Sequence, residues 1–478
     1  MYVLYNIKMH RRRDNKKRNI QHETKAELTM SGTVHEQMTM EQFIDHFADE
    51  PRINIIRSFM ALGFENLTIS QAKFFPSILN DKDFIGMEKS GTGKSQCAIV
   101  RAIDLIYKTD FKRRLNRYGE AEIACLVVAN NADLAVQLAE CFKNYQTYND
   151  IRIECCIRGT PESVNVDNIR KNVPDIIVGT PGRLLSLISG PKHKRCISLE
   201  QLRMIYVDEA DAILSNTHDV DERSTAKSQL EDILLATRYR KNGKLINNRT
   251  QYLFVSATWN DYSINHIKDI LKFIRTNDDV ELESTYVEPD ISLIENEVLC
   301  KTNIREYMVY LGDEDASFKI RMKTLLDILD RTSAILKCVI FCNRKDDIDE
   351  LTEILSKEGY SVSKVHAGLS NDMAQGTITE LQNNTIRFAV VSDVFSRGID
   401  ITGINCVINF NFPRKKREAK GFSDAASTYI HRIGRSARGT TDGFAINFIT
   451  EEDMPVIETI EKTYGNIFKE FPMDNEDL

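Results

Sequence analysis

Short apolar runs alternate along the chain with longer segments in which apolar residues recur at helical spacing. This alternation is typical of parallel strands connected by helices, because each strand is buried on both faces while each helix is apolar on one. The fold class predicted is α/β, with a mostly parallel sheet flanked by helices. The apolar runs lie at 123–129, 175–178, 204–207, 252–255, 338–341, 362–365, 388–391 and 406–410.

The apolar runs fall into two sets with the same layout but no short sequence period, which predicts two similar domains rather than a solenoid. An irregular acidic stretch separates the two sets and is interpreted as a linker. The expected boundaries are a basic, disordered tail at 1–42, a first domain at 43–280, a linker at 281–297 and a second domain at 298–478.

Polar or small residues follow the predicted strands directly. Because ligands of open α/β sheets bind beyond the carboxyl ends of the strands, these residues mark one working edge in each sheet. In the first domain they are Asn130-Asn131, Gly179-Thr180-Pro181-Gly182, Asp208-Glu209 and Ser256-Ala257-Thr258, and in the second Cys342-Asn343, His366-Ala367-Gly368, Ser392-Asp393 and Asn411.

With 478 residues, the chain is long enough for two or more domains, each with its own core. Ten cysteines without C-x-x-C pairs, and apolar runs too short to span a bilayer, predict an intracellular protein of the cytoplasm, the nucleus or both, with no membrane contact. The basic clusters within 11–18 are interpreted as a solvated tail, with nuclear import or RNA contact as the alternative. A net charge of −7 means that any nucleic-acid partner needs specific local contacts.

A glycine-rich loop reads Ser90-Gly91-Thr92-Gly93-Lys94-Ser95. Its backbone N–H groups and the helix that follows suit phosphate oxygens, Lys94 suits the β and γ phosphates, and Ser95 suits Mg²⁺. Glu88 stands where the P-loop pattern expects a small residue. Taken alone, the loop is also compatible with a simple turn before a helix.

The acidic sequence Asp208-Glu209-Ala210-Asp211 closes the apolar run 204–207. Carboxylates at the end of a second strand, beside a phosphate loop, are placed to hold Mg²⁺ and to handle an attacking water. The two motifs together predict a nucleotide-hydrolysing site.

With this tetrad, three further motifs give the chain its resemblance to the DEAD-box RNA helicases over residues 43–478. They are Ser256-Ala257-Thr258, Arg397-Gly398-Ile399-Asp400 and His431-Arg432-Ile433-Gly434-Arg435-Ser436-Ala437-Arg438, which stand in the family's order. The resemblance implies two RecA-like domains joined by a short linker and an RNA-stimulated ATPase that unwinds RNA or remodels ribonucleoproteins. It also implies ATP and Mg²⁺ as cofactors, single-stranded RNA and activating proteins as partners, and a monomeric core.

The resemblance assigns roles at the nucleotide site. Phe47 would stack on the base and Gln71 would read adenine, while Asp400 would sense the nucleotide and contact Arg435. Arg435 and Arg438 are three residues apart, which places both on one helix face, and the family uses them as arginine fingers. The residues expected to bind phosphate and Mg²⁺ or to act on water are Ser90, Gly91, Thr92, Gly93, Lys94, Ser95, Asp208 and Glu209.

Further positions are implied to couple the two domains or to contact the RNA backbone. The coupling residues are Asp211, Ser256, Thr258 and His431. The RNA-binding residues are Arg158, Gly159, Thr180, Gly182, Arg183, Gly368, Ser392 and Asp393. Backbone contacts of this kind bind single strands without reading bases.

Several departures from the family pattern leave a second function open. Glu88, Asn130-Asn131 and Gln375 replace residues common in the family, and they motivate an alternative in which the chain is a weakly hydrolysing RNA clamp or scaffold. Within the family the chain looks most similar to the nuclear-pore mRNA-export branch, with translation-initiation and splicing-associated helicases as competitors.

Overall fold

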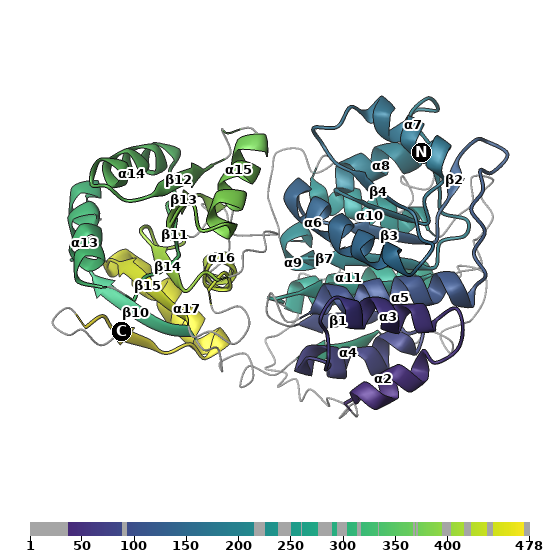
Figure 1. Ribbon diagram of the computed structural model, residues 1–478, viewed down its shortest axis with the longest axis horizontal. Helices are drawn as coiled ribbons and strands as arrows, with labels where there is room; N and C mark the ends of the chain where they lie inside the picture. Colours follow the sequence, from purple (N-terminus) through teal and green to yellow (C-terminus); the bar gives the residue numbers. More distant parts are fainter. Residues whose placement is uncertain are drawn as a thin grey trace, which may run out of the picture. The chain divides into compact units, whose positions relative to one another are not determined.

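A computed structural model describes fourteen stretches of the chain. They are residues 37–87, 93–214, 225–237, 250–259, 261–275, 289–293, 304–312, 317–332, 334–366, 369, 371–393, 403–414, 422–436 and 443–472. Two seven-stranded sheets account for most of the strands, and every strand pair within them is parallel (Figure 1). The α/β fold with two helix-flanked parallel sheets is therefore confirmed.

The first sheet has the strand order β4-β5-β3-β7-β8-β1-β9. Its strands are β1 (Phe84–Met87), β3 (Cys125–Val128), β4 (Ile153–Cys156), β5 (Ile176–Gly179), β7 (Met204–Asp208), β8 (Gln251–Ser256) and β9 (Asp290–Leu293). A separate pair joins β2 (Ala121–Glu122) to β6 (Ile197–Ser198). Helices of this half are α2 (Met40–His46), α3 (Ile53–Ala61), α4 (Ile69–Leu79), α5 (Lys94–Lys108), α6 (Ala132–Lys143), α7 (Glu162–Asn172), α8 (Pro181–Ser189), α9 (Ala210–Leu214), α10 (Ala226–Ala236) and α11 (Asp261–Arg275).

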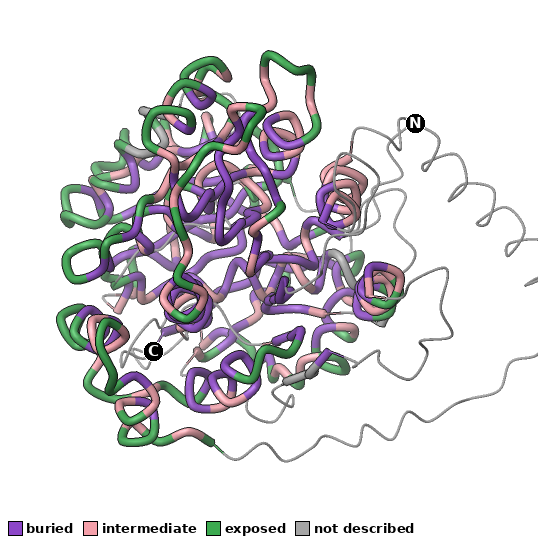
Figure 2. Tube along the Cα trace, turned by 90° about the vertical axis from the view of Figure 1, so that its right-hand side faces the viewer, coloured by how far each residue is buried: buried purple, intermediate pink, exposed green. Residues whose placement is uncertain are grey.

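The two faces of the first sheet belong to different cores, which β7 shows most clearly. Met204 and Tyr206 pack into the cluster that contains α5, whereas Ile205 and Val207 pack into the cluster that contains α8. Side chains alternate between the faces of a strand, so a strand that is apolar on both faces must be covered twice. Figure 2 shows buried residues gathered in the interior of the fold and exposed residues at its periphery.

The second sheet repeats the layout with the order β12-β13-β11-β14-β15-β10-β16. Its strands are β10 (Ile304–Tyr310), β11 (Cys338–Phe341), β12 (Val362–Val365), β13 (Phe388–Val391), β14 (Cys406–Asn409), β15 (Gly443–Ile449) and β16 (Phe468–Glu470). The helices are α13 (Phe318–Arg331), α14 (Lys345–Lys357), α15 (Asn371–Gln382), α16 (Ser423–Ile433) and α17 (Met454–Tyr464).

All eight apolar runs singled out in the sequence contain strands, but the segment predicted as a linker is not wholly irregular. Residues 290–293 form β9, which pairs in parallel with β1. The pairing begins with Phe84 opposite Asp290. The sequence did not predict these four paired positions, because the surrounding stretch is acidic and lacks an apolar run. This part of the predicted linker therefore extends the first sheet.

None of the helices in the described stretches has both the length and the apolar character that crossing a membrane requires.

Candidate functional site

The amino end of α5 provides the candidate phosphate site. Gly93 has φ +90°, and a Cβ atom there would lie 2.5 Å from Nε2 of Gln71. Both its backbone angle and the close amide therefore require glycine. Lys94, the first residue of this 15-residue helix, is buried, and the positive end of the helix dipole at this position favours phosphate oxygens. Ser90, Gly91 and Thr92 lie outside the described residues, as does Glu88.

Asp208, at the carboxyl end of β7, faces the first turn of α5. Ser95 Oγ donates to Asp208 Oδ2 over 3.4 Å, and the Glu209 N–H donates to Asp208 Oδ1 over 3.0 Å. Burial raises the pKa of Asp208 to about 6, while the positive charge of Lys94 lowers it. The structure thus brings a hydroxyl, a carboxylate and a lysine together at the predicted position.

A hydroxyl beside a carboxylate fits Mg²⁺, because this cation prefers oxygen ligands and completes its shell with waters and substrate phosphates. Within the described ranges no group of three or more His, Cys, Asp or Glu side chains could hold a metal ion. A P-loop cation does not need such a group, so Ser95 and Asp208 satisfy the donor set that Mg²⁺ requires from the protein.

Glu209 adopts a left-handed backbone conformation with φ +48°, which is uncommon for a residue other than glycine. Its side chain is buried, and its Oε2 has no hydrogen-bond partner in the part of the chain that the structure describes. A buried carboxylate oxygen without a donor is unfavourable unless another group, such as a water, supplies one. The geometry suits a residue that orients or deprotonates water.

Gln71 belongs to a capping box at the start of α4. Its backbone N–H donates to Thr68 Oγ1 over 3.2 Å, and its Oε1 accepts the Thr68 N–H over 2.9 Å. Nε2 is buried and has no partner among the described residues. The capping box therefore fixes the Gln71 side-chain amide and leaves its Nε2 group available as a donor. The N7 atom of a purine is an acceptor of the kind that glutamine binds.

Phe47 does not occupy the position expected of a base-stacking ring. It is fully buried, with its centroid 5.2 Å from that of Phe43, and the guanidinium of Arg52 lies 5.1 Å from its centre. A ring enclosed in the core offers no face to a base. The sequence could not reveal this, because the burial of Phe47 depends on how α2 packs against α3 and α4.

The four predicted coupling residues meet around one carboxylate. Asp211 accepts hydrogen bonds from the hydroxyls of Ser256 and Thr258, the latter over 2.5 Å. Nε2 of His431 lies 3.7 Å from Asp211 Oδ2 and 3.5 Å from Thr258 Oγ1, and Thr258 Oγ1 is 2.9 Å from Ser427 Oγ. The coupling group thus joins Asp211, the second residue of α9, to α16 in the second domain.

The predicted arginine fingers are described only in part. Arg435 is buried in the turn after α16, and its Nε donates to the His431 carbonyl over 3.3 Å. Arg438 and Asp400 lie outside the described residues, so their predicted roles stay predictions.

The candidate RNA residues of the first domain come together after β4 and β5, which are neighbouring strands. Arg158 and Gly159 are exposed in the loop after β4, where Gly159 has φ +102°. Thr180 begins α8, and Arg183 on that helix donates to the Thr160 carbonyl over 3.0 Å. Gly182 packs so closely that an added Cβ would be 2.9 Å from Gln229 Oε1.

In the second domain Ser392 and Asp393 follow β13. Ser392 Oγ is buried without a partner among the described residues, whereas Asp393 is exposed and accepts from Arg432 Nε over 2.6 Å. The fully buried Arg432 also donates to Asn409 and Asn343. Sequence reasoning missed Arg432 as a support for Asp393, although its place in the His431-Arg432 pair was a usable signal. Gly368 and the side chain of Gln375 are not described.

Two other residues have roles that the sequence did not reveal. Asn131 caps α6 by accepting the Leu134 N–H over 2.8 Å, which is a structural use of a departure from the family pattern. Trp259 donates its Nε1–H to the Gly86 carbonyl over 2.8 Å. It thereby joins the Ser256-Ala257-Thr258 turn to the strand before the phosphate loop.

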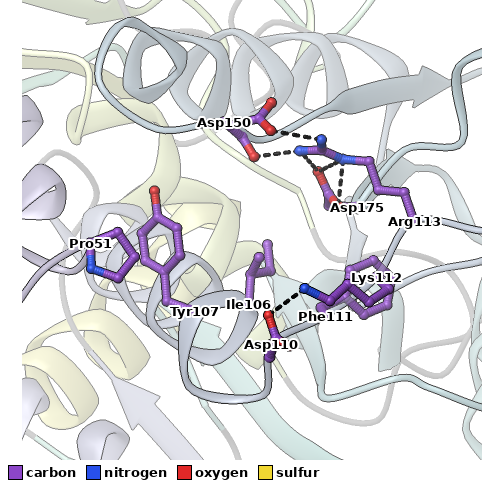
Figure 3. Close-up of a pocket in the computed structure, with 9 residues that line it drawn as sticks. All are labelled: Pro51, Ile106, Tyr107, Asp110, Phe111, Lys112, Arg113, Asp150 and Asp175. Carbon is purple, nitrogen blue, oxygen red and sulfur yellow. Dashed lines mark hydrogen bonds and ion pairs between the residues drawn. The ribbon is translucent and has the colours of Figure 1, made fainter.

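A pocket of about 420 Å³ lies at the amino ends of the strands and not at the candidate site (Figure 3). Its lining includes Tyr107, Phe111 and Arg113, and Arg113 is paired with Asp150 and Asp175. Because Asp175 directly precedes β5, the pocket is at the opposite edge of the first sheet from Asp208.

Comparisons with known proteins show which family the chain belongs to. Residues 68–267 match the DEAD/DEAH box helicase model, and residues 320–440 match the helicase conserved C-terminal domain. The ATP-dependent RNA helicase FAL1 of Eremothecium gossypii is 27% identical over 425 residues, which cover 89% of this chain and 92% of that protein. The ATP-dependent RNA helicase eIF4A of Candida albicans is 28% identical over 422 residues, which cover 88% and 90%.

A structural comparison supports the fold. The structure of Saccharomyces cerevisiae Dbp5 bound to RNA and ADP BeF3 aligns with a TM-score of 0.67 at 21% identity, covering 91% of this chain and 96% of that one.

Proposed function

Because the chain belongs to the DEAD-box family of ATP-dependent RNA helicases, we propose that Asp208 and Ser95 hold Mg²⁺ with ATP and that Glu209 acts on the attacking water. The enzyme is an RNA-dependent ATPase. Bound Mg²⁺ would neutralise charge that develops on the phosphates. Lys94 adds a second positive charge, and the Gln71 amide orients the base.

The observation that carries the proposal is the environment of Glu209. Its Oε2 is buried and unpartnered among the described residues, and its backbone is held in a left-handed conformation next to Asp208. This arrangement favours an ATP-hydrolysing enzyme over a weakly hydrolysing RNA clamp, because a clamp does not require a carboxylate placed to accept a hydrogen bond from water. General-base catalysis contributes about 10²–10⁴-fold to a rate.

The coupling group around Asp211 suggests how RNA would control hydrolysis. Its hydrogen bonds connect the strand end next to the hydrolytic residues with α16, which carries His431 and leads to Arg435. We propose that RNA bound at Arg158, Thr180 and Arg183 in the first domain, and at Ser392 and Asp393 in the second, stabilises the catalytic arrangement of this group.

Phosphate release measured with and without single-stranded RNA tests the function. We expect RNA to stimulate turnover, and Glu209→Gln to lower it by roughly 10²–10⁴-fold while nucleotide binding persists. Glu140→Gln, a surface change on α6, should keep normal turnover. An ATPase rate that RNA does not change, or that Glu209→Gln does not lower, would contradict the proposal. Tight ATP-dependent RNA binding without ATP hydrolysis would support the clamp instead.

The RNA substrate class, protein partners, location and family branch are proposed on the resemblance alone. We place the chain inside the cell, as a monomeric core stimulated by activating proteins, and nearest to the nuclear-pore mRNA-export branch. Imaging the full chain and a variant lacking 1–20 tests whether the basic tail directs nuclear entry.

A further inference from the structure

Tyr206 lies two residues before Asp208 on β7, so both side chains are on the same face of the strand. That face packs against α5, because Tyr206 shares a core cluster with Cys97 and Ala98. Ser95 is on the first turn of the same helix. The Tyr206 ring therefore extends between β7 and α5 toward the Ser95–Asp208 pair.

The hydroxyl of Tyr206 is buried, and no hydrogen bond of ordinary geometry reaches it within the described ranges, although Ser95 and Asp208 are its polar neighbours. The other three fully buried tyrosines all have one: Tyr145 donates to Gln96 over 2.8 Å, Tyr252 pairs with Thr237 at 2.5 Å, and Tyr429 donates to Glu306 over 2.5 Å. Leaving a hydroxyl buried and unpaired costs roughly 1–3 kcal/mol, so this exception calls for a ligand or a movement that satisfies it.

The neighbours of the hydroxyl identify what it serves. The hydroxyl lies within reach of both the Ser95 hydroxyl and the Asp208 carboxylate. A phenol can donate a hydrogen bond and a carboxylate accepts one, so the Tyr206 hydroxyl is a donor beside Asp208. Phenylalanine would fill the same space without the cost of a buried hydroxyl.

We propose that Tyr206 is a positioning residue whose hydroxyl holds the Asp208 carboxylate and the Ser95 hydroxyl in the arrangement that binds Mg²⁺ with ATP; this rests on the nucleotide site proposed above. Ser95 now donates to Asp208 over a long 3.4 Å. If Ser95 turns its oxygen toward a cation, Tyr206 supplies the carboxylate with a second donor from within the core. Such partners of metal ligands fix ligand orientation and typically alter metal affinity 10–100-fold.

The test uses Tyr206→Phe in the full chain and measures equilibrium binding of a fluorescent, non-hydrolysable ATP analogue across a Mg²⁺ titration. We expect the Mg²⁺ midpoint to rise roughly 10-fold. Binding without Mg²⁺ should be unchanged, and thermal unfolding without ligands should show equal or higher stability, because an unpaired hydroxyl has been removed.

Tyr252→Phe is the matched control, since Tyr252 is a buried tyrosine on the neighbouring strand and on the opposite face. It should keep the wild-type Mg²⁺ midpoint. An unchanged midpoint in Tyr206→Phe, or an equal shift in both variants, overturns the inference while leaving the proposed function intact. If the wild-type chain binds the analogue without any dependence on Mg²⁺, the proposed site itself fails.

Discussion

At the scale of single residues, Asp208 combines a catalytic position with an unfavourable burial. Its pKa is raised to about 6, above the ordinary value of 3.8, mainly by loss of solvent. The folded state therefore binds this proton more readily than the unfolded state. Stability gained from protonation is complete below the unfolded pKa and is lost as the pH rises through about 6.

Asp208→Asn should therefore raise the melting temperature of the protein at pH 7.5, measured without nucleotide or divalent cations. Each kcal/mol corresponds to about 2–4 °C in a domain of this size. The gain should shrink as the pH falls toward 4, where wild-type Asp208 is itself neutral. Asp150→Asn is the contrasting control, since the Arg113 hydrogen bond lowers the Asp150 pKa and its loss should not stabilise the protein. A melting temperature of Asp208→Asn at or below wild type would refute the effect.

Among the elements, α4 links a helix start to nucleotide recognition. Thr68→Ala removes the hydroxyl that caps Gln71, and loss of such a cap costs about 1 kcal/mol. Because the same residue pair orients the Gln71 amide, we also expect weaker ATP binding, by severalfold. Equilibrium binding and thermal unfolding measure the two effects.

The chain contains its own control for this prediction. Thr39 and Gln42 form a second capping box at α2, with hydrogen bonds of 2.8 and 3.2 Å. Thr39→Ala should cost a similar amount of stability but leave ATP binding unchanged. Equal losses of binding in both variants would show that general destabilisation, and not the orientation of Gln71, is responsible.

The sequence predicted eight strands from the runs singled out in it, and it missed others, among them β1 and β10. β1 is four residues with a glycine in the middle, and β10 includes Arg305 and Glu306 within its ladder. Such strands form because neighbours complete their hydrogen bonds, which is a property of the assembled sheet and not of the local pattern.

The candidate site was predictable where polar residues lie at the end of a strand or follow it closely, as at Ser95, Asp208 and Asp211. Phe47 was misassigned because its burial is decided by tertiary packing. Arg432 and Tyr206 were overlooked because each acts through another residue, and only the fold shows which one. For Tyr206 the sequence did carry a clue, a hydroxyl two residues before Asp208 in an otherwise apolar strand.

On the scale of the whole molecule, the contact between Thr258 and Ser427 joins elements of the two sheets. A hydrogen bond of this kind contributes about 1 kcal/mol, or roughly fivefold in a rate. Ser427→Ala should reduce the RNA stimulation of ATP hydrolysis by about that factor and leave hydrolysis without RNA unchanged. Thr459→Ala is the control, because Thr459 is a half-buried threonine on α17 whose hydroxyl donates within its own helix, to the Pro455 carbonyl.

A double-mutant cycle with Thr258→Ala isolates the contact between the two hydroxyls. The effect of Ser427→Ala on RNA stimulation should largely vanish when Thr258 is already alanine. Fully additive effects would mean that Ser427 acts through some other neighbour.

Trp259 is the sole tryptophan of the chain, and its indole N–H donates to the carbonyl of Gly86, a residue of β1 that lies four positions before Ser90 of the phosphate loop. When the excitation wavelength is chosen so that the 16 tyrosines absorb little, the emission of the unlabelled protein therefore arises mainly at one point, between the turn that contacts α16 and the loop proposed to meet phosphate. Any rearrangement that breaks this hydrogen bond, or that removes water from around it, should change the wavelength or the intensity of the tryptophan emission. The enzyme thus carries a built-in optical probe of its own catalytic cycle, which stopped-flow fluorescence can follow without an added dye.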